Sequence, residues 1–284
     1  MQTTPTIRLI SVDMDGTLLN PKGRVTSGNL QAIRAAQQAG IIFSVATGRF
    51  YENASIGIKD MGLNCPVIST NGGKIAAAPF GEVIASHKMS ADSALAVMRQ
   101  LDELEAGYYV FSDGLVGVRL PHDRHHSQVE FGDDRMLHET NTRYLNGHDA
   151  CRDAIHRGIY KFYVHTFGDR DRLQHVRRAL QGIPDTVLTH SSETNIEIMP
   201  PGVDKGSGIR ELAAYLNIPV SQVMAIGDQD NDLPMLKAAG FGVAMGNASQ
   251  DVKRQADAIT STNAEDGVAQ AILRYALPSS GGQA

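Results

Sequence analysis

The fold is decided by the stretch Ile7–Leu18, which reads IRLISVDMDGTL. Its first half is a short apolar run that is typical of a buried strand. Two carboxylates one residue apart, Asp13 and Asp15, follow this strand, and Gly16 then permits a sharp turn that exposes backbone amides. Open α/β sheets place their active sites past the carboxyl ends of parallel strands. We therefore expect Asp13 and Asp15 at such a site, although an ordinary solvated turn uses the same residue types.

Strand-like and helix-like segments alternate outward from this stretch. Apolar runs predict strands at 7–12, 41–46 and 66–69, with helices between them at 26–39 and 50–60 and a hairpin over 74–85. The alternation resumes after residue 195, with strands expected at 223–227 and 241–244 and helices near 231–239, 248–255 and 264–276. This order of elements predicts the parallel sheet of an α/β fold.

The middle of the chain has a different character. We expect helices at 90–105, 148–157 and 170–181 and strands at 108–111, 115–118 and 159–167, which is an α+β pattern. All ten histidines lie in this region, from His87 to His190. The shift in composition predicts a discontinuous core at 1–86 and 192–284 that is interrupted by a separate domain at 87–191.

Length and composition limit the classes of protein. The chain has 284 residues, so a usual domain size of about 150 residues predicts roughly two domains. Hydrophobic residues make up 42% and charged residues 20%, which excludes a disordered, collagen-like or coiled-coil chain. The net charge of −5 argues against nucleic acid or an anionic membrane as a partner. With only two cysteines and no long apolar run, we expect a cytoplasmic protein.

Two further motifs offer groups that bind phosphate. Thr47 and Gly48 follow the expected strand at 41–46, where a hydroxyl and a backbone amide can donate to a phosphate oxygen. Lys205 lies at the expected start of a helix, where the helix dipole already favours anions. The alternatives are an ordinary N-cap threonine and a solvated surface lysine.

The stretch 226–232, which reads IGDQDND, follows another expected strand. Asp228, Asn231 and Asp232 supply carboxylate and amide oxygens, the hard ligands that magnesium prefers. The alternative is an acidic helix cap. Because every motif either follows a strand or opens a helix, we expect them to form one site suited to phosphoryl transfer.

The motifs DMDGTL, VATGR, VDKG and GDQDND occur in this order along the chain. Together with Thr70–Gly73, which reads TNGG, and Ile196–Gly202, which reads IEIMPPG, they resemble the haloacid dehalogenase superfamily and, within it, the Cof-like small-molecule phosphatases. The resemblance implies a Rossmann-like parallel-sheet core, with the insert at 87–191 as a type-two cap. Within the insert, the resemblance rests on position and length alone.

The resemblance also implies a role for each motif residue. Asp13 is the implied nucleophile, and Asp15 is the implied general acid and base. Phosphate binding is assigned to Thr47, Gly48, Lys205 and Asn231. Magnesium binding is assigned to Asp13, the backbone carbonyl of Asp15, Asp228 and Asp232, the last of which orients the metal-bound waters or the lysine.

These roles predict a magnesium-dependent phosphomonoester hydrolase that forms an aspartyl-phosphate. We expect a small phosphorylated metabolite as substrate, foremost a sugar phosphate, or a phosphorylated cofactor such as pyridoxal phosphate or flavin mononucleotide. Two alternatives stay open. The first is a phosphosugar mutase on the same core, and the second, less favoured, is a non-catalytic ligand-binding module. We expect no nucleic-acid or membrane partner, and either a monomer or a homodimer.

Overall fold

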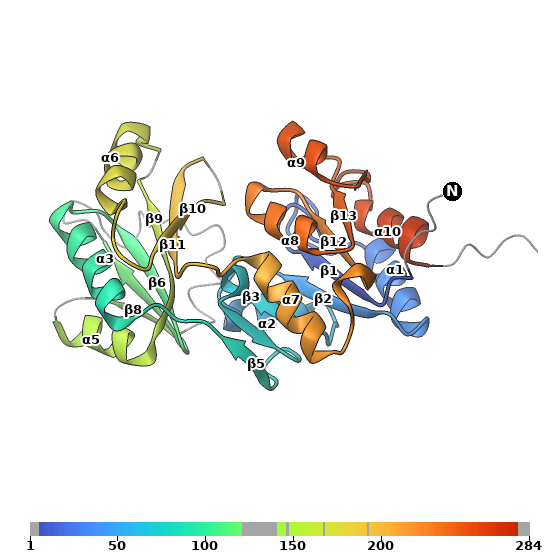
Figure 1. The fold of residues 1–284 in the computed structure, drawn as a ribbon, viewed down its shortest axis with the longest axis horizontal. Helices are drawn as coiled ribbons and strands as arrows, with labels where there is room; N and C mark the ends of the chain where they lie inside the picture. The colour runs from blue at the N-terminus through green and yellow to red at the C-terminus, as the bar shows by residue number, and fades with distance from the viewer. Residues whose placement is uncertain (1–5, 121–140, 146–147, 167, 192, 278–284) are drawn as a thin grey trace, which may run out of the picture. The chain divides into compact units, whose positions relative to one another are not determined.

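The computed structural model describes residues 6–120, 141–145, 148–166, 168–191 and 193–277 (Figure 1). The chain divides into two compact units. The core unit comprises Met1–Gly48, Ala54–Ala85 and Asp204–Ala284, and the inserted unit comprises Arg49–Asn53 and Ser86–Val203. The core unit is thus assembled from stretches of chain on both sides of the insert. Part of the expected insert, 121–140, lies outside the described residues.

An eight-stranded sheet forms the centre of the core unit, in the order β14-β13-β12-β1-β2-β3-β4-β5. Neighbouring strands from β14 to β3 are parallel, and β4 runs antiparallel to β3. The strands are β1 (Leu9–Asp13), β2 (Ile42–Ala46), β3 (Val67–Ser69), β4 (Lys74–Ala76), β5 (Val83–Ser86), β12 (Val223–Gly227), β13 (Phe241–Ala244) and β14 (Ala258–Ile259).

β1 lies between β12 and β2, and it is parallel to both. Every residue of β1 is buried, as expected for a parallel strand that is covered on both faces. The chain passes from β1 to β2 on one side and returns to β12 on the other, so the strand order reverses at β1. The carboxyl end of β1 is therefore the switch point at which open α/β sheets bind their ligands.

Helices pack against this sheet and fix the ends of its strands. They are α1 (Ser27–Gln38), α2 (Tyr51–Asp60), α7 (Lys205–Tyr215), α8 (Leu233–Ala238), α9 (Gln250–Gln255) and α10 (Gly267–Ala271). α7 and α8 supply Ile209, Leu212, Met235 and Leu236 to a buried cluster that also contains Leu9 of β1. α1 packs against β2 and α10. Removal of this apolar surface from water holds the first turn of α7 at a defined place in the core.

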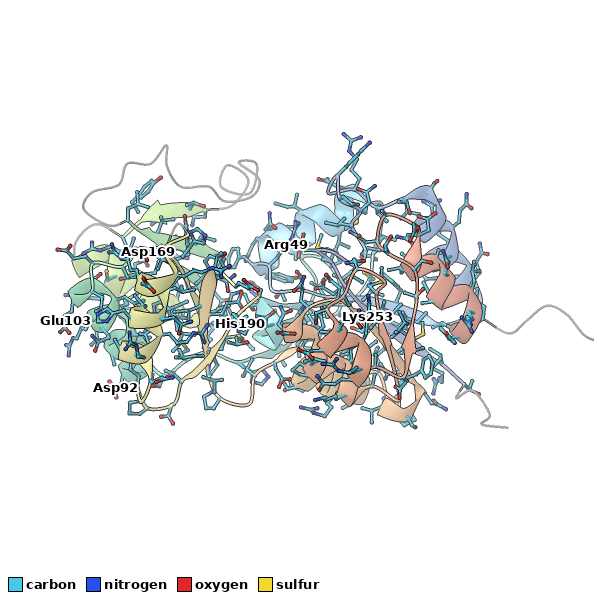
Figure 2. The ribbon with its side chains drawn as sticks, turned by 90° about the horizontal axis from the view of Figure 1, so that it is seen from above. Arg49, Asp92, Glu103, Asp169, His190 and Lys253 are labelled. Carbon is cyan, nitrogen blue, oxygen red and sulfur yellow. The ribbon has the colours of Figure 1, made fainter. Side chains whose placement is uncertain are left out.

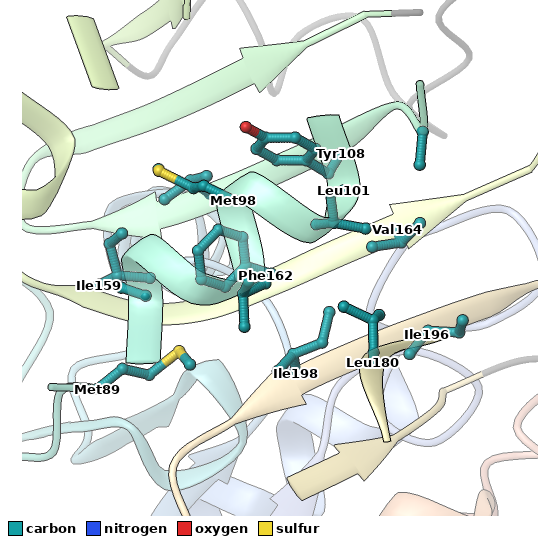
Figure 3. Close-up of a cluster of buried hydrophobic side chains, with 14 of the residues drawn as sticks. Met89, Met98, Leu101, Tyr108, Ile159, Phe162, Val164, Leu180, Ile196 and Ile198 are labelled. Atoms are coloured by element: carbon teal, nitrogen blue, oxygen red, sulfur yellow. The ribbon is translucent and has the colours of Figure 1, made fainter. Parts of the chain in front are cut away.

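A six-stranded sheet in the order β10-β11-β9-β6-β7-β8 forms the inserted unit. Its strands are β6 (Tyr108–Ser112), β7 (Leu115–Arg119), β8 (Thr142–Tyr144), β9 (Ile159–His165), β10 (Val187–Thr189) and β11 (Asn195–Met199), and its helices are α3 (Ala91–Glu103), α5 (His148–Arg157) and α6 (Arg170–Leu180). Asp169, labelled in Figure 2, caps α6 by accepting from the amide of Arg172. Side chains of the helices and strands together form one buried cluster (Figure 3).

The position of β11 differs from the expected boundary. We placed the return to the core at residue 192, but β11 pairs antiparallel with β9 and β10, and the inserted unit extends to Val203. The physical reason is the alternation along β11. Ile196 and Ile198 point into the cluster beneath the helices, and Glu197 points the other way and pairs with Lys161 at 2.9 Å.

The short elements were the least predictable. β8 and β10 were not expected, because each spans three residues that are largely exposed or half-buried and carry no apolar alternation. The expected helix at 231–239 begins as a 3₁₀ turn, η4 (Asp230–Asp232), and the expected helix at 264–276 ends in a π-helical turn over Ile272–Ala276. Within the described part of the chain, no helix combines the length and the apolar character needed to cross a membrane.

Candidate active site

Three carboxylates gather at the carboxyl end of β1. Asp13 is the last residue of β1, Asp228 directly follows β12, and Asp232 is the last residue of η4. All three residues are buried, and one oxygen from each lies within 4.8 Å of the others. They meet because β12 and β1 are parallel neighbours whose carboxyl ends share one edge of the sheet.

Lys205, the first residue of α7, is the buried cation of this cluster. Its Nζ donates to Oδ1 of Asp13 at 2.5 Å and to Oδ1 of Asp232 at 2.6 Å. Asp204 caps α7 by accepting from the amide of Ser207, so the lysine projects from a fixed first turn. Burial lowers the pKa of Lys205, but the charges of Asp13 and Asp232 outweigh burial and raise it above its usual value.

Two of these carboxylates, those of Asp13 and Asp228, are destabilised in their charged form. Burial raises the pKa of Asp13 well above its usual value; Asp232 adds to the rise, and Lys205 opposes it. Burial likewise raises the pKa of Asp228 to about 6, against the hydrogen bond from Thr17. When ionised, the three carboxylates outnumber the one lysine, so the cluster then carries an excess of negative charge on hard oxygen atoms. This donor set fits a divalent cation with oxygen ligands.

Asp228 is held by side chains from several segments. Thr17 Oγ1 donates to its Oδ1 at 2.8 Å, while Gln229 Nε2 and Asn247 Nδ2 donate to its Oδ2 at 3.1 and 3.3 Å. Asn247 Nδ2 also donates to the backbone carbonyl of Gly16 at 2.8 Å. Gly16 has a φ of +82°, and a Cβ atom there would lie 2.4 Å from Oδ2 of Asp228. Only glycine permits this close approach.

Sequence reasoning missed Thr17, Gln229 and Asn247 as supports of Asp228. Thr17 and Gln229 lie within motifs already singled out, but a local pattern does not say which group a side chain reaches. Asn247 lies shortly after β13, the parallel neighbour of β12. The available signal in the sequence was that Asn247 is a polar residue shortly after the strand expected at 241–244, as other site residues follow their strands.

Asp232 uses both of its carboxylate oxygens within the protein. Oδ1 accepts from Lys205, and Oδ2 accepts from the backbone amides of Asp228 and Gln229, each at 2.9 Å. Of the two roles implied for Asp232, orientation of the lysine is the one that these contacts favour.

The remaining expected residues lie on neighbouring loops. Thr47 and Gly48 directly follow β2, and Thr47 is buried. Asn231 lies in η4, and its Nδ2 donates to Oδ1 of Asn71 at 3.4 Å. The amide of Asn71 donates to the carbonyl of Thr47 at 3.0 Å, so Asn71 links these two loops. Asp15 is exposed just past the end of β1.

Comparisons with known proteins find similarity over nearly the whole chain. The sequence-family model that describes haloacid dehalogenase-like hydrolases matches residues 10–272 of this chain. The chain is 33% identical over 282 residues to the phosphatase YwpJ of Bacillus subtilis. The match covers 93% of this chain and 98% of YwpJ. The chain is 32% identical over 275 residues to the 5-amino-6-(5-phospho-D-ribitylamino)uracil phosphatase YcsE of the same organism, with 95% and 96% covered.

The fold has a similar counterpart among solved structures. A haloacid dehalogenase-like hydrolase from B. subtilis has a TM-score of 0.83 and 30% identity to this chain, and the match covers 94% of this chain and 99% of the other. Because the family model and these relatives extend across both core segments and the insert, the chain belongs to the haloacid dehalogenase-like hydrolase family.

Proposed function

We propose that this phosphatase hydrolyses phosphomonoesters of small metabolites, with magnesium as its cofactor and Asp13 as its nucleophile. The observation that carries the proposal is the 2.5 Å contact between Nζ of Lys205 and Oδ1 of Asp13 inside a buried cluster of carboxylates. A lysine that holds a buried carboxylate also presents its charge to an anion that approaches the same carboxylate.

Electrostatics explain why a nucleophilic carboxylate needs these neighbours. At about 4 Å and an effective dielectric constant near 20, each pair of like unit charges costs about 4 kcal/mol. Lys205 reduces the repulsion between Asp13 and a phosphate dianion. Magnesium, held by Asp13, the backbone carbonyl of Asp15 and Asp228, supplies the remaining neutralisation of charge when bound.

In the first half of the proposed reaction, the carboxylate of Asp13 attacks phosphorus. The bond from Asp13 to phosphorus forms, and the bond from phosphorus to the ester oxygen breaks. Asp15, exposed beside the nucleophile, donates its proton to the leaving oxygen, so the product alcohol departs neutral. Lys205 stabilises the charge on the phosphoryl oxygens.

In the second half, water hydrolyses the aspartyl-phosphate. Asp15, now a carboxylate, takes a proton from the water as the water attacks phosphorus. The bond from phosphorus to Asp13 breaks, which releases inorganic phosphate and restores the carboxylate. Asp232 acts through Lys205, whose position it fixes at 2.6 Å.

Different parts of the chain bind the two ends of the proposed substrate. We assign the phosphate group to Thr47, Gly48, Lys205 and Asn231. We assign the leaving group to the inserted domain, expected at 87–191, as a type-two cap. The similarity to YcsE, whose name includes a phosphorylated ribityl compound, supports a phosphorylated sugar or sugar alcohol as the substrate class.

We also propose a cytoplasmic location and a monomer or homodimer. The cysteines Cys65 and Cys151 are both free, which is compatible with a reducing compartment. Burial raises the pKa of Cys65 to about 12, so this thiol is inert at neutral pH.

The proposal is tested by the release of inorganic phosphate from a panel of phosphorylated metabolites. We expect turnover with magnesium and without any bisphosphate activator, loss of turnover with EDTA, and recovery when magnesium is added. Asp13→Asn should abolish turnover, and beryllium fluoride should modify Asp13 in the parent protein. Turnover that persists after thorough chelation contradicts the metal assignment, and isomerised substrate without free phosphate indicates a mutase.

A further inference from the structure

The segment that follows β3 has an unusual backbone conformation. Thr70, Asn71 and Gly72 are consecutive residues with φ values of +48°, +53° and +97°, and all three are buried. A β-branched residue such as threonine rarely adopts a positive φ. Such strain persists only where the surrounding structure holds it, and it concentrates at functional sites.

The close packing of this segment explains how the strain is held. A Cβ atom on Gly72 would lie 2.3 Å from the backbone carbonyl oxygen of Asp204, the residue before Lys205. The amide of Asn71 donates to the carbonyl of Thr47 at 3.0 Å. The segment is therefore fixed between the loop that carries Thr47 and the start of α7.

The side chain of Asn71 reaches two groups that we assign to phosphate binding. Its Oδ1 lies 2.9 Å from the position that a Cβ atom on Gly48 would take. The same Oδ1 accepts from Nδ2 of Asn231 at 3.4 Å. The left-handed conformation thus places one acceptor atom beside both loops.

We infer that Asn71 is a positioning residue that turns the amide of Asn231 so that its NH2 group, rather than its carbonyl, serves the phosphate. A phosphate oxygen only accepts, so Asn231 must present Nδ2, which carries two hydrogens. One hydrogen goes to Oδ1 of Asn71, and the second remains for the phosphate.

No other contact in the described part of the chain sets this orientation. Oδ1 of Asn231 is buried and has no hydrogen-bond partner there. At 3.4 Å, the bond to Asn71 is longer than a usual N–H···O hydrogen bond, so its contribution is orientation more than stability. The inference rests on the proposed phosphate-binding role of Asn231.

The test measures inhibition by inorganic phosphate, with magnesium present, alongside kcat and KM. Asn71→Gly removes the acceptor but tolerates the positive φ. We expect phosphate inhibition to weaken about fivefold to tenfold, the usual effect of one lost hydrogen bond. Asn231→Ala should weaken phosphate inhibition at least as much. Phosphate should inhibit the double variant about as strongly as it inhibits Asn231→Ala alone.

Two further variants keep the test independent of folding. Asn217→Gly is the matched control, because Asn217 also has a positive φ of +54° in the core unit and is exposed, so phosphate inhibition should not change. Asn71→Asp retains both an acceptor and tolerance of the left-handed conformation. In the Asn71→Asp protein, Asn231→Ala should weaken phosphate inhibition by about as much as in the parent protein, whereas in the Asn71→Gly protein its effect should be clearly smaller.

The outcomes separate the two proposals. If Asn231→Ala weakens phosphate inhibition and Asn71→Gly does not, the positioning role of Asn71 is wrong and the proposed function stands. Additive effects of the two substitutions also overturn the positioning role. If Asn231→Ala has no effect, the phosphate-binding role of Asn231 is wrong, and the inference fails with it.

Discussion

Lys205 and Asp13 are 192 residues apart in the sequence, yet Nζ of the lysine lies 2.5 Å from Oδ1 of the aspartate. Lys205 follows Asp204, the residue at which the chain re-enters the core unit after the insert. The apolar face of α7 packs on the sheet that contains β1, and this packing brings the two charges together. Both side chains are buried, so each charge is stabilised by its oppositely charged partner rather than by water.

Removal of Lys205 should destabilise the core more than removal of the carboxylate of Asp13. Lys205→Met leaves three buried carboxylates without their cation and should lower the free energy of unfolding by about 3–5 kcal/mol. Asp13→Asn, the matched variant, reduces the repulsion among the carboxylates, so the free energy of unfolding should stay equal or rise. Urea denaturation with EDTA present measures both. Equal destabilisation by the two variants would show that Asp13 stabilises the lysine as much as the lysine stabilises the carboxylates, and would contradict the expected net repulsion among the carboxylates.

The stability of the metal-free protein should fall as the pH rises from about 4 to about 6. Burial raises the pKa of Asp228 from 3.8 to about 6, so the folded state binds more protons than the unfolded state in this interval. Above this pH interval, Asp228 is an ionised, buried carboxylate, and the folded state loses the stability that the bound proton contributed. Thermal unfolding in EDTA at a series of pH values measures this slope, which Asp228→Asn should reduce.

The stabilisation by added magnesium should have the opposite pH dependence, because carboxylates bind metal ions only in their ionised form. We expect a small increase in Tm near pH 5 and a larger one at pH 7. At a concentration about 100 times Kd, the increase should be roughly 5–10 °C. A rise in Tm that is the same at both pH values would contradict the assignment of Asp228 as a ligand.

Asn247→Ala should weaken the binding of magnesium while leaving the fold intact. Asn247 donates to Oδ2 of Asp228 and to the carbonyl of Gly16, so it orients the proposed ligand Asp228 without binding the metal itself. Loss of such a supporting contact usually lowers metal affinity about 10- to 100-fold. Calorimetric titration with magnesium measures the change. Asn64→Ala, at another exposed asparagine of the core unit, is the control and should bind magnesium normally.

Two adjacent tyrosines of β6 should respond differently to truncation. Tyr108 packs in the cluster under the helices, and its hydroxyl donates to Asp102 at 3.2 Å. Tyr109 lies in a separate cluster with Phe111 on the other face of the strand. Tyr108→Ala should lower the free energy of unfolding by about 3–5 kcal/mol. Tyr109→Ala should change the preference among substrates, if the inserted unit selects the leaving group.

The comparison of substrate panels with phosphate inhibition completes this test. Phosphate contacts are assigned to the core, so Tyr109→Ala should leave inhibition by inorganic phosphate unchanged. If Tyr109→Ala slows all substrates by the same factor, the inserted unit is not the element that determines specificity.

The local features of this protein could be predicted from its sequence. The apolar run before Asp13 and the turn residues after it specify a strand that ends in carboxylates, because strand periodicity and turn chemistry depend on neighbours in the chain. The order of strands and helices predicted the parallel sheet, and parallel strands share one carboxyl edge. That edge, together with the expected helix start at Lys205, was enough to name Asp13, Asp228 and Lys205 as members of one site.

Only the tertiary structure decided which atoms meet. Whether Asp232 holds Lys205, whether Asn247 supports Asp228, and whether β11 belongs to the inserted sheet all depend on strand pairing and helix packing between distant segments. Asn71 shows the difference most clearly. In the sequence, the TNGG stretch contributed only to the family resemblance. The packing of Gly72 against Asp204 shows that this stretch is fixed against the start of α7, because steric contact depends on neighbours in three dimensions.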